Sequence, residues 1–298
     1  MISIITGGAG FIGSHLAEKL ISLGHKVIII DNFSNGKINN IKSFKNKIKL
    51  IKADISKANS KWTNCFKKAD YVFHLAALAD IVPSINHPRK YFNSNVVGTF
   101  NVLEACRENK NLRILYAASS SCYGIPKKYP TKESSKISTK YPYAFTKNVG
   151  EAMMIHWNQV YKLKTFTARL FNVYGERSRT SGTYGAVFGV FLAQKLAKKP
   201  FTIVGTGNQS RDFTYVTDVV SALIKIIKSK YYGEVFNIGS GETVSINKIV
   251  KLLGGKKKFI PKRPREPNMT FANIDKIKYK LGWKPIVKIE DGILKLLK

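Results

Sequence analysis

The chain has 298 residues, of which 44% are hydrophobic and 11% aromatic, so there is enough apolar material for a sizeable core. Basic residues outnumber acidic ones by 50 to 18, and the net charge of +32 suggests nucleic acid, an anionic membrane or an acidic substrate. Only nine of the basic residues are Arg, and such a Lys excess is also typical of compositional bias on a solvated surface. The length favours one large α/β domain, alone or with a small lobe.

The cysteines and the apolar runs exclude several classes of protein. Cys65, Cys106 and Cys122 are odd in number, lie far apart and form no C-x-x-C pair, which argues against a disulfide framework and a zinc site. The chain opens directly on an apolar strand without a secretory signal. No apolar run approaches the ~18 residues of a membrane span. We therefore expect a cytoplasmic protein with no metal and no membrane partner.

Apolar runs alternate with helical patterns through the first part of the chain. Strands are predicted at 2–6, 27–31, 48–52, 71–75, 112–117 and 164–170, and helices at 12–23, 60–68, 89–108 and 144–162. Strands that alternate with helices form right-handed βαβ units and a parallel sheet covered on both faces. The sequence thus predicts a Rossmann-type, doubly wound α/β domain over residues 1–171.

The alternation loosens after residue 172. Helices are predicted at 185–198, 216–228, 245–253 and 275–281, mixed with short strands and a Pro-rich stretch at 261–267. We expect residues 172–298 to form mainly a smaller α/β substrate lobe, with some segments returning to the first domain. The stretch 125–140 is rich in Lys, Pro, Ser and Thr and predicts a mobile segment.

A glycine motif follows the first predicted strand. Gly7, Gly10 and Gly13 lie where that strand passes into a helix, so backbone N–H groups and the helix N-terminus can approach a pyrophosphate. Asp31 ends the second strand, where a carboxylate can bind ribose hydroxyls. Because this carboxylate would repel a 2′-phosphate, the motif favours NAD over NADP.

A second motif, Y-x-x-x-K, is formed by Tyr143 and Lys147 on a predicted helix. Residues four apart share a helix face, so the ammonium can lie beside the phenol. A nearby cation favours the phenolate and would make Tyr143 a base near neutral pH. Upstream, Ser119, Ser120 and Ser121 follow the strand 112–117, where parallel sheets bind ligands.

With these motifs, the chain resembles the extended short-chain dehydrogenases/reductases, in the NAD-dependent nucleotide-sugar epimerase/dehydratase family, and most closely the UDP-glucose 4-epimerases. The resemblance covers nearly the whole chain. Besides the two motifs, it rests on Asp54-Ile55, His74-Leu75-Ala76-Ala77, Asn95-Val96-Val97-Gly98-Thr99, the stretches 169–175 and 211–218, and Leu281-Gly282-Trp283.

The resemblance implies roles for individual residues. NAD would be bound by Gly7, Gly10, Phe11, Ile12, Gly13, Asp31, Asn32, Asp54, Ile55, Leu75, Ala76, Ala77, Asn95, Tyr143 and Lys147. The catalytic set would be Ser119, Tyr143 and Lys147. The nucleotide sugar would contact Ser119, Ser121, Tyr143, Asn172, Val187, Arg211, Arg263 and Glu266. Thr270 lies near a position that controls room at the sugar C2 substituent.

The implied reaction is inversion of C4 of a UDP-hexose through a 4-keto intermediate. In the 4,6-dehydratases, Asp and Glu stand where this chain has Ser120 and Ser121, so water elimination lacks its acid–base pair. UDP-glucose/UDP-galactose and UDP-GlcNAc/UDP-GalNAc stay open as substrate pairs. Another nucleotide-sugar epimerase or reductase on this scaffold, and an atypical member that binds RNA or regulates, remain as alternatives. The intact motifs argue against specific nucleic-acid binding.

The family also implies a homodimer. Members of the family pair through two helices into a four-helix bundle, and the corresponding helices here are those predicted at 89–108 and 144–162. Met153, Met154 and Trp157 are the candidate contacts on the second of these helices.

Overall fold

The computed structural model describes residues 1–180, 187–261 and 267–297. They form two compact units. The first comprises Met1–Cys122, Thr139–Arg169 and Val220–Phe236, and the second comprises Tyr123–Ser138, Leu170–Val219 and Asn237–Lys298. No helix in the described ranges is both long and apolar enough to cross a membrane.

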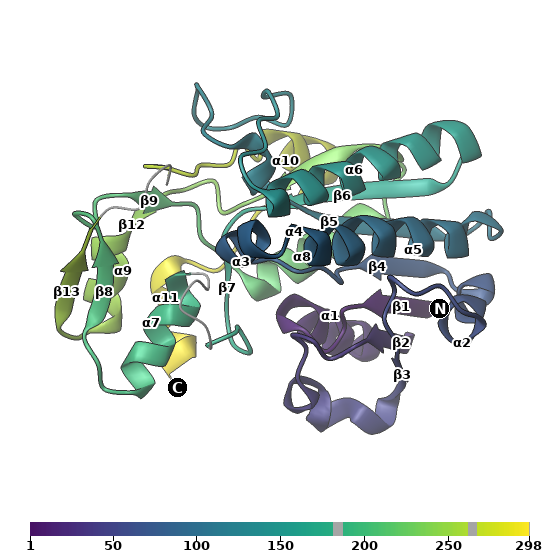
Figure 1. Ribbon diagram of the computed structural model, residues 1–298, viewed down its shortest axis with the longest axis horizontal. Coiled ribbons are helices and arrows are strands. Elements are labelled where there is room, and N and C mark those ends of the chain that lie inside the picture. Colours follow the sequence, from purple (N-terminus) through teal and green to yellow (C-terminus); the bar gives the residue numbers. More distant parts are fainter. Residues whose placement is uncertain (181–186, 262–266, 298) are drawn as a thin grey trace. The chain divides into compact units, whose positions relative to one another are not determined.

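A seven-stranded sheet forms the centre of the first unit (Figure 1). Its strands are β1 (Ile2–Thr6), β2 (Lys26–Asp31), β3 (Ile48–Lys52), β4 (Tyr71–His74), β5 (Arg113–Ser119), β6 (Lys164–Leu170) and β11 (Val235–Ile238). Their order is β11-β6-β5-β4-β1-β2-β3. The pairs β1–β2, β1–β4, β2–β3 and β4–β5 are parallel. This is the predicted Rossmann-type arrangement.

Helices cover this sheet. They are α1 (Phe11–Ser22), α2 (Ser60–Thr63), α3 (Ile81–Asn86), α4 (Pro88–Phe92), α5 (Gly98–Arg107), α6 (Pro142–Tyr161) and most of α8 (Val216–Ile227). Helix α1 packs on β1 and β2, and α6 packs on β5 and α5. The core includes Ile4, Trp62, Val72, Ile114 and Met154, all fully buried. Burial of such side chains is the main stabilising term.

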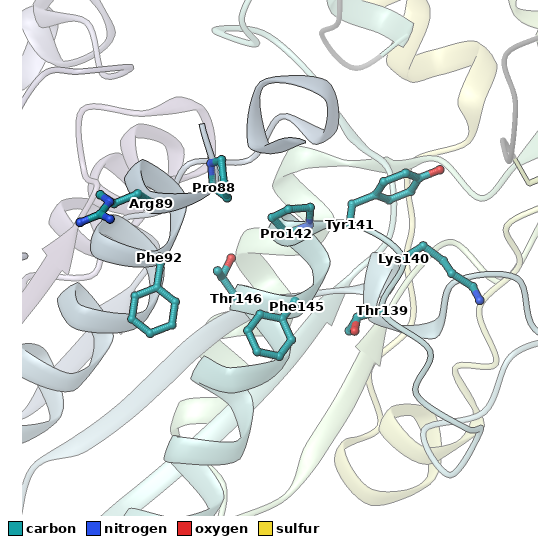
Figure 2. A pocket seen from close by; sticks show the side chains of 9 residues that line it. All are labelled: Pro88, Arg89, Phe92, Thr139, Lys140, Tyr141, Pro142, Phe145 and Thr146. Atoms are coloured by element: carbon teal, nitrogen blue, oxygen red, sulfur yellow. The ribbon is translucent and has the colours of Figure 1, made fainter. Parts of the chain in front are cut away.

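A pocket of ≈ 520 Å³ lies beside α4 and the start of α6. Its lining comprises Pro88, Arg89, Phe92, Thr139, Lys140, Tyr141, Pro142, Phe145 and Thr146 (Figure 2). Phe92 and Phe145 are about half exposed, at 44% and 49%. This pocket is therefore an apolar surface feature of the helical layer.

The second unit is built from short paired strands and four helices of its own. Its elements are β7 (Val173–Tyr174), α7 (Val187–Leu196), β8 (Phe201–Val204), β9 (Ser210–Arg211), β10 (Thr214–Tyr215), β12 (Val244–Ser245), α9 (Ile246–Leu253), β13 (Lys257–Ile260), α10 (Asp275–Leu281) and α11 (Ile289–Leu297). The pairs are β7–β10, β8–β13 and β9–β12. The side chains of Tyr174, Phe188 and Phe213 contact one another in its core.

The predicted strands of the first unit agree with the structure to within two residues. The helix expected at 89–108 is divided into α4, a π-helical turn at Asn93–Val97 and α5. The helix expected at 60–68 is α2 followed by a 3₁₀ turn. Helix α3 and strand β11 were not predicted, because each is short. Helix α11 was also missed, although its apolar residues follow helical spacing.

The segment Tyr123–Ser138, which includes most of the stretch 125–140 expected to be mobile, belongs to the second unit. Thr131 N–H donates to Phe271 O (2.7 Å), and Asn273 N–H donates to Thr131 O (2.9 Å). The Tyr123 hydroxyl donates to Asn237 Oδ1 (2.7 Å). These bonds, formed with residues more than 100 positions away, fix a segment whose composition alone suggests a loop.

Candidate active site

The glycine motif forms a tight loop between β1 and α1. Gly7 has a φ of +73°, and a Cβ there would lie 2.7 Å from Ala76 N. A Cβ on Gly13 would lie 2.3 Å from Gly7 O, so this glycine lets α1 pack directly on the loop. Ser14 N–H makes the first helical bond, to Gly10 O. The N–H groups of the first turn precede that bond and suit a pyrophosphate.

Asp31 lies beside this loop. Its carboxylate accepts hydrogen bonds from Ala9 N–H (2.9 Å) and Phe33 N–H (2.8 Å). Burial raises the pKa of Asp31, and these two bonds act in the opposite direction. Because β4, β1 and β2 are adjacent and parallel, their ends bring Leu75, Ala76 and the carboxylate to the same edge of the sheet. This edge can hold a dinucleotide with free ribose hydroxyls.

The remaining cofactor candidates follow the same edge. Asn32 is exposed and accepts a bond from Ser34 N–H (3.0 Å). Asp54 accepts bonds from both the N–H and the hydroxyl of Ser56, so its carboxylate shapes the turn after β3. Ile55 is buried in the core. Ala77 is half-buried after β4.

Asn95 lies in the π-helical turn and is only 1% exposed. Its Oδ1 accepts from Leu78 N–H (2.8 Å), and its Nδ2 donates to Leu78 O (3.0 Å) and Thr146 Oγ1 (3.0 Å). The side chain that we expected to bind cofactor is thus engaged by the protein. Its amide holds the segment after β4 against helix α6.

Ser119 ends β5, and Tyr143 lies in the first turn of α6. The Ser119 hydroxyl lies close enough to Tyr143 to favour its phenolate form. Ser119 Oγ also accepts from the Ser121 hydroxyl (2.9 Å) and from Ser121 N–H (3.2 Å). The structure therefore brings together the three hydroxyls that the sequence singled out.

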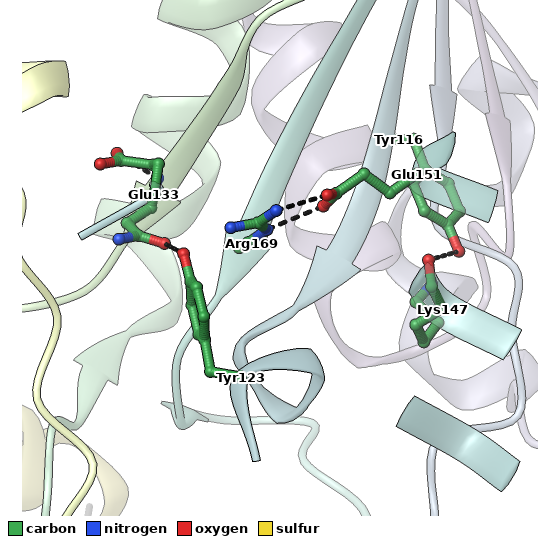
Figure 3. Close-up of polar contacts among 7 residues, drawn as sticks. Tyr116, Tyr123, Glu133, Lys147, Glu151 and Arg169 are labelled. Atoms are coloured by element: carbon green, nitrogen blue, oxygen red, sulfur yellow. Dashed lines mark hydrogen bonds and ion pairs between the residues drawn. The ribbon is translucent and has the colours of Figure 1, made fainter. Parts of the chain in front are cut away.

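Lys147 lies one turn after Tyr143 on α6 and is 3% exposed. Its Nζ lies 4.2 Å from the centroid of the Tyr116 ring. The Tyr116 hydroxyl donates to the backbone oxygen of Lys147 (3.3 Å), as Figure 3 shows. A Cβ on Gly150 would lie 2.4 Å from that hydroxyl. Tyr116 and Gly150 support helix α6, and neither was identified from the sequence.

Burial dominates the electrostatics of the Tyr143–Lys147 pair. It lowers the pKa of Lys147 to about 7. It also raises the pKa of Tyr143, while the nearby Ser119 hydroxyl acts in the opposite direction. Desolvation therefore favours the neutral form of both groups. Activation of Tyr143 by the ammonium stays a prediction.

A buried ion pair lies further along the same helix. Glu151 follows Lys147 by one turn, and its carboxylate binds the Arg169 guanidinium through Nε (2.8 Å) and Nη2 (2.5 Å), as shown in Figure 3. Both side chains are 6% exposed. The pair joins α6 to β6. The spacing of Tyr143, Lys147 and Glu151, each four residues from the next, is the signal that could have revealed it.

Two substrate candidates lie in the second unit. Asn172 Nδ2 donates to Asp212 O (2.9 Å) and Thr270 Oγ1 (2.8 Å). Arg211 is 9% exposed, and its Nη1 donates to Ser210 O (2.9 Å) and Asn268 O (3.3 Å). The two side chains are thus attached to neighbouring segments of one unit.

Asp212 organises this part of the second unit and was missed from the sequence. Its buried carboxylate accepts bonds from Ser240 N–H (2.6 Å), Gly241 N–H (3.2 Å) and Ala272 N–H (3.1 Å). Burial raises its pKa, and these bonds oppose that effect. Two distant segments, one at Ser240-Gly241 and one at Ala272, therefore converge on a residue adjacent to Arg211.

Three other expectations have different outcomes. Val187 begins α7 and is half-buried. Arg263 and Glu266 lie outside the described residues. Within the described ranges, His, Cys, Asp and Glu side chains do not gather into a group of three or more that could hold a metal ion.

The proposed interface contacts need correction. Met154 is fully buried in the core, and Trp157 is 8% exposed, with its Nε1 donating to Glu104 Oε1 (3.1 Å). Met153 also packs against the core. These side chains face inward because α6 covers β5 and α5. The exposed apolar side chains of the same helical layer include Phe92, Phe100 and Phe145.

Comparison with known proteins finds similarity over nearly the whole chain. The profile of the GDP-mannose 4,6 dehydratase family matches residues 4–296. A UDP-glucose 4-epimerase from Mycolicibacterium smegmatis is 33% identical over 306 residues, covering 99% of this chain and 97% of that protein.

Solved structures agree with this placement. A UDP-N-acetylglucosamine 4-epimerase from Methanobrevibacter ruminantium M1, in complex with UDP-N-acetylmuramic acid, superposes with a TM-score of 0.93 at 32% identity, covering 99% of this chain and 97% of that one. A UDP-glucuronic acid 4-epimerase from Bacillus cereus, in complex with UDP-glucuronic acid and NAD, gives a TM-score of 0.91 at 32% identity, with coverage of 99% and 97%. The chain therefore belongs to the GDP-mannose 4,6-dehydratase-like family of extended short-chain dehydrogenases/reductases, a family of NAD-dependent nucleotide-sugar epimerases and dehydratases.

Proposed function

We propose that this protein is an NAD-dependent epimerase that inverts C4 of a UDP-hexose. UDP-glucose and UDP-galactose form the first substrate pair, and UDP-GlcNAc and UDP-GalNAc form the second. The observation that carries the proposal is the hydrogen-bonded pair of Ser119 and Ser121 beside Tyr143, with Lys147 one helical turn further along α6. This set offers a proton acceptor for a sugar hydroxyl without a further carboxylic acid for elimination.

The glycine loop fits the cofactor. Gly7 and Gly13 leave no space for a Cβ, so the backbone can come close to a pyrophosphate, and Asp31 would bind the adenosine ribose. Bound NAD would supply a nicotinamide that takes up hydride from C4 and returns it, so the reaction consumes no reductant. Lys147, next to Tyr143 on α6, would bind the nicotinamide ribose.

The protein's own groups then move one proton. Tyr143 would accept the proton of the C4 hydroxyl, with Ser119 donating a hydrogen bond that stabilises the developing phenolate. Asn172 and Arg211 would hold the diphosphate while the keto sugar turns to present its other face. Remote binding energy at the diphosphate allows the reacting ring to stay loosely held.

Ser120 and Ser121 favour epimerisation over the related eliminations. A 4,6-dehydration requires an acid and a base at these two positions, and serine supplies neither near neutral pH. The half-buried Ser121 hydroxyl already donates to Ser119 Oγ. Its contribution would therefore be to orient Ser119 and contact the sugar.

The direct test is an NMR assay with no added cofactor. Purified protein is incubated separately with UDP-glucose, UDP-GlcNAc and UDP-glucuronate, and the product sugar is identified by its coupling constants. We expect interconversion at C4 with UDP-glucose or UDP-GlcNAc. A keto-deoxy product or loss of a carboxylate would contradict the proposal.

Tyr143→Phe is the decisive variant. Because it removes the proton acceptor while preserving the ring, we expect kcat to fall by about 10²–10⁴-fold. The content of copurified NAD, measured after denaturation, should remain that of the unsubstituted protein. Normal turnover in Tyr143→Phe would refute the assignment of Tyr143 as the base.

We further propose that the protein is a homodimer formed through α4, α5 and α6. Phe92 and Phe100 are each 44% exposed and Phe145 is 49% exposed, and large exposed apolar side chains on one helical layer are typical of an interface. The partner is a second copy of this chain, as the family implies.

A further inference from the structure

A series of buried hydrogen bonds crosses the first unit, using side chains that the proposed reaction does not. It begins at Thr6, the last residue of β1, whose Oγ1 lies 2.7 Å from His74 Nδ1. His74 ends β4, and its Nε2 lies 2.9 Å from Thr99 Oγ1. All three side chains are 0% exposed, so water cannot replace any of these bonds.

The series continues to the catalytic helix. The Thr99 hydroxyl donates to Asn95 O (2.5 Å). Asn95 Nδ2 donates to Thr146 Oγ1 (3.0 Å), and the Thr146 hydroxyl donates to Tyr143 O (2.9 Å). The Asn95 amide also pairs with the backbone of Leu78. We call Thr6, His74, Thr99, Asn95 and Thr146 the buried polar chain.

Only one placement of the protons satisfies the hydrogen bonds in the central part of the buried polar chain. Because the hydroxyl hydrogen of Thr99 is directed to Asn95 O, its oxygen must accept from His74 Nε2–H. His74 Nδ1 then accepts from the Thr6 hydroxyl. Burial lowers the pKa of His74 to about 3, so the imidazole is neutral, as this pattern requires. Every link is satisfied, and the loss of one leaves buried groups without partners.

The buried polar chain connects the parts of the first unit that the reaction must align. One end is the strand that leads into the glycine loop, where Ala76 N–H also lies 3.4 Å from Thr6 Oγ1. The middle attaches the segment containing Leu78. The other end is the backbone carbonyl of Tyr143. A rigid neutral imidazole with one donor and one acceptor is well suited to the central position.

We propose that His74 is a positioning residue that, through Thr99, Asn95 and Thr146, holds Tyr143 in register with the glycine loop. It does not exchange a proton during turnover. The expected loss of turnover in variants of this series rests on the proposed function. The expected displacement of Tyr143 does not rest on it.

The test removes single hydrogen bonds of the buried polar chain without removing a charged or catalytic group. Thr99→Val and Thr146→Val are nearly isosteric changes at two different links, and His74→Gln probes the centre. Thr165→Val is the matched control, because the Thr165 hydroxyl also donates to a carbonyl of α6, that of Met154 (2.8 Å), far from Tyr143. Each variant protein is assayed together with the nucleotide that copurifies with it.

Two readouts are measured for each variant. We expect Thr99→Val and Thr146→Val to lower kcat about tenfold or more with little change in KM, as small misplacements of a reacting group do. The ionisation of Tyr143, followed by absorbance with Tyr143→Phe as the blank, should move to higher pH as the Ser119 bond is disturbed. Thr165→Val should lower stability to a similar extent but change neither readout. The double variant that combines Thr99→Val and Thr146→Val should have a kcat no lower than that of the slower single variant. One lost hydrogen bond already interrupts the buried polar chain.

Equal kcat values and equal Tyr143 titrations in Thr99→Val, Thr146→Val and Thr165→Val would overturn the proposal. So would a pH profile of kcat from which one titration disappears in His74→Gln, since that result identifies an acid–base role. If the unsubstituted protein converts no UDP-sugar, the proposed function fails, and the Tyr143 titration still decides the positioning role. His74→Gln is not essential, because the two threonine variants remain informative if it does not fold.

Discussion

At the scale of single residues, the active site shows how strongly burial competes with charge. A sequence motif places Lys147 next to Tyr143, and spacing alone suggests that the ammonium activates the phenol. The structure encloses the ammonium among side chains such as Tyr116, at 4.2 Å. Spacing along a helix predicts which residues are neighbours, but it does not predict how much water they lose. For that reason the residue identities could be predicted and their protonation could not.

The buried ammonium gives a testable dependence of stability on pH. The pKa of Lys147 falls from 10.5 to about 7 on folding, so the unfolded chain binds more protons between these values. Stability therefore increases as the pH rises from about 7 to 10.5, and the cost of the buried charge is fully present below pH 7.

Lys147→Met should remove that cost. In nucleotide-free protein we expect it to raise the free energy of unfolding by on the order of 5 kcal/mol below pH 7, with the gain vanishing by about pH 10.5. Urea denaturation at several pH values measures it. Lys61→Met, at an exposed position, serves as control. A gain that is constant with pH would show that the ammonium is not desolvated.

At the scale of secondary structure, the elements that carry strong periodic patterns were predictable and their tertiary attachments were not. The strands β1 to β6 were predicted from their apolar patterns, and the βαβ rule predicts that they form a parallel sheet. In contrast, the spacing of Glu151 places it on the helix face of Tyr143 and Lys147 but does not reveal its partner. Its burial depends on Arg169, which is 18 positions away on β6, and only the packing of helix on sheet brings the two together.

The Glu151–Arg169 pair makes α6 sensitive to loss of one charge. Glu151→Ala should lower the free energy of unfolding by about 3–5 kcal/mol, since it leaves the Arg169 guanidinium buried without its carboxylate. Chemical denaturation checks this value. The control is Glu290→Ala, whose partner Lys248 lies 2.7 Å away with both side chains about half exposed, and it should cost less than about 1 kcal/mol. Similar losses in the two variants would mean that Arg169 finds water or another partner.

The proposed interface also belongs to this scale. Phe100 on α5 is 44% exposed, and its ring contacts that of Trp157 at 5.7 Å. Phe100→Lys should weaken dimerisation by about thirtyfold or more, as expected for loss of an apolar anchor. Analytical ultracentrifugation measures the change, with Tyr279→Lys, at a residue 94% exposed on α10, as the matched control. Equal dissociation constants for the two variants would contradict the interface.

At the scale of the whole molecule, the chain passes between the two units more often than the sequence pattern indicates. The strand–helix alternation loosens after residue 172, and the second run of the first unit, Thr139–Arg169, ends close to that position. The exchange of Tyr123–Ser138 into the second unit could not be predicted. It depends on buried hydrogen bonds of Asn237 and Thr131 with distant residues, and neither residue type signals such contacts.

The positive charge is a property of the whole chain, consistent with an acidic ligand as well as with compositional bias. With a net charge of +32, the folded state repels itself, because folding brings the lysines closer together. Salt screens this repulsion, and the Debye length falls from ~30 Å at 0.01 M to ~8 Å at 0.15 M. We expect the protein to gain stability over this range, with Tm rising by about 3 °C or more. A dianionic UDP-sugar should show the opposite trend, with kcat/KM falling as steering is screened.

Two variants separate charge from other effects of salt. Lys256, Lys257 and Lys258 form an exposed run around the start of β13. Changing all three to Glu should raise Tm at low salt and flatten its rise with salt, because each change lowers the net charge by two. Changing the same three to Arg keeps the charge and should leave the slope unaltered. If Tm rose equally with salt in both variants, ion-specific effects on hydrophobic burial would explain it. The charge would then act through the approach of the anionic substrate and not through the stability of the fold.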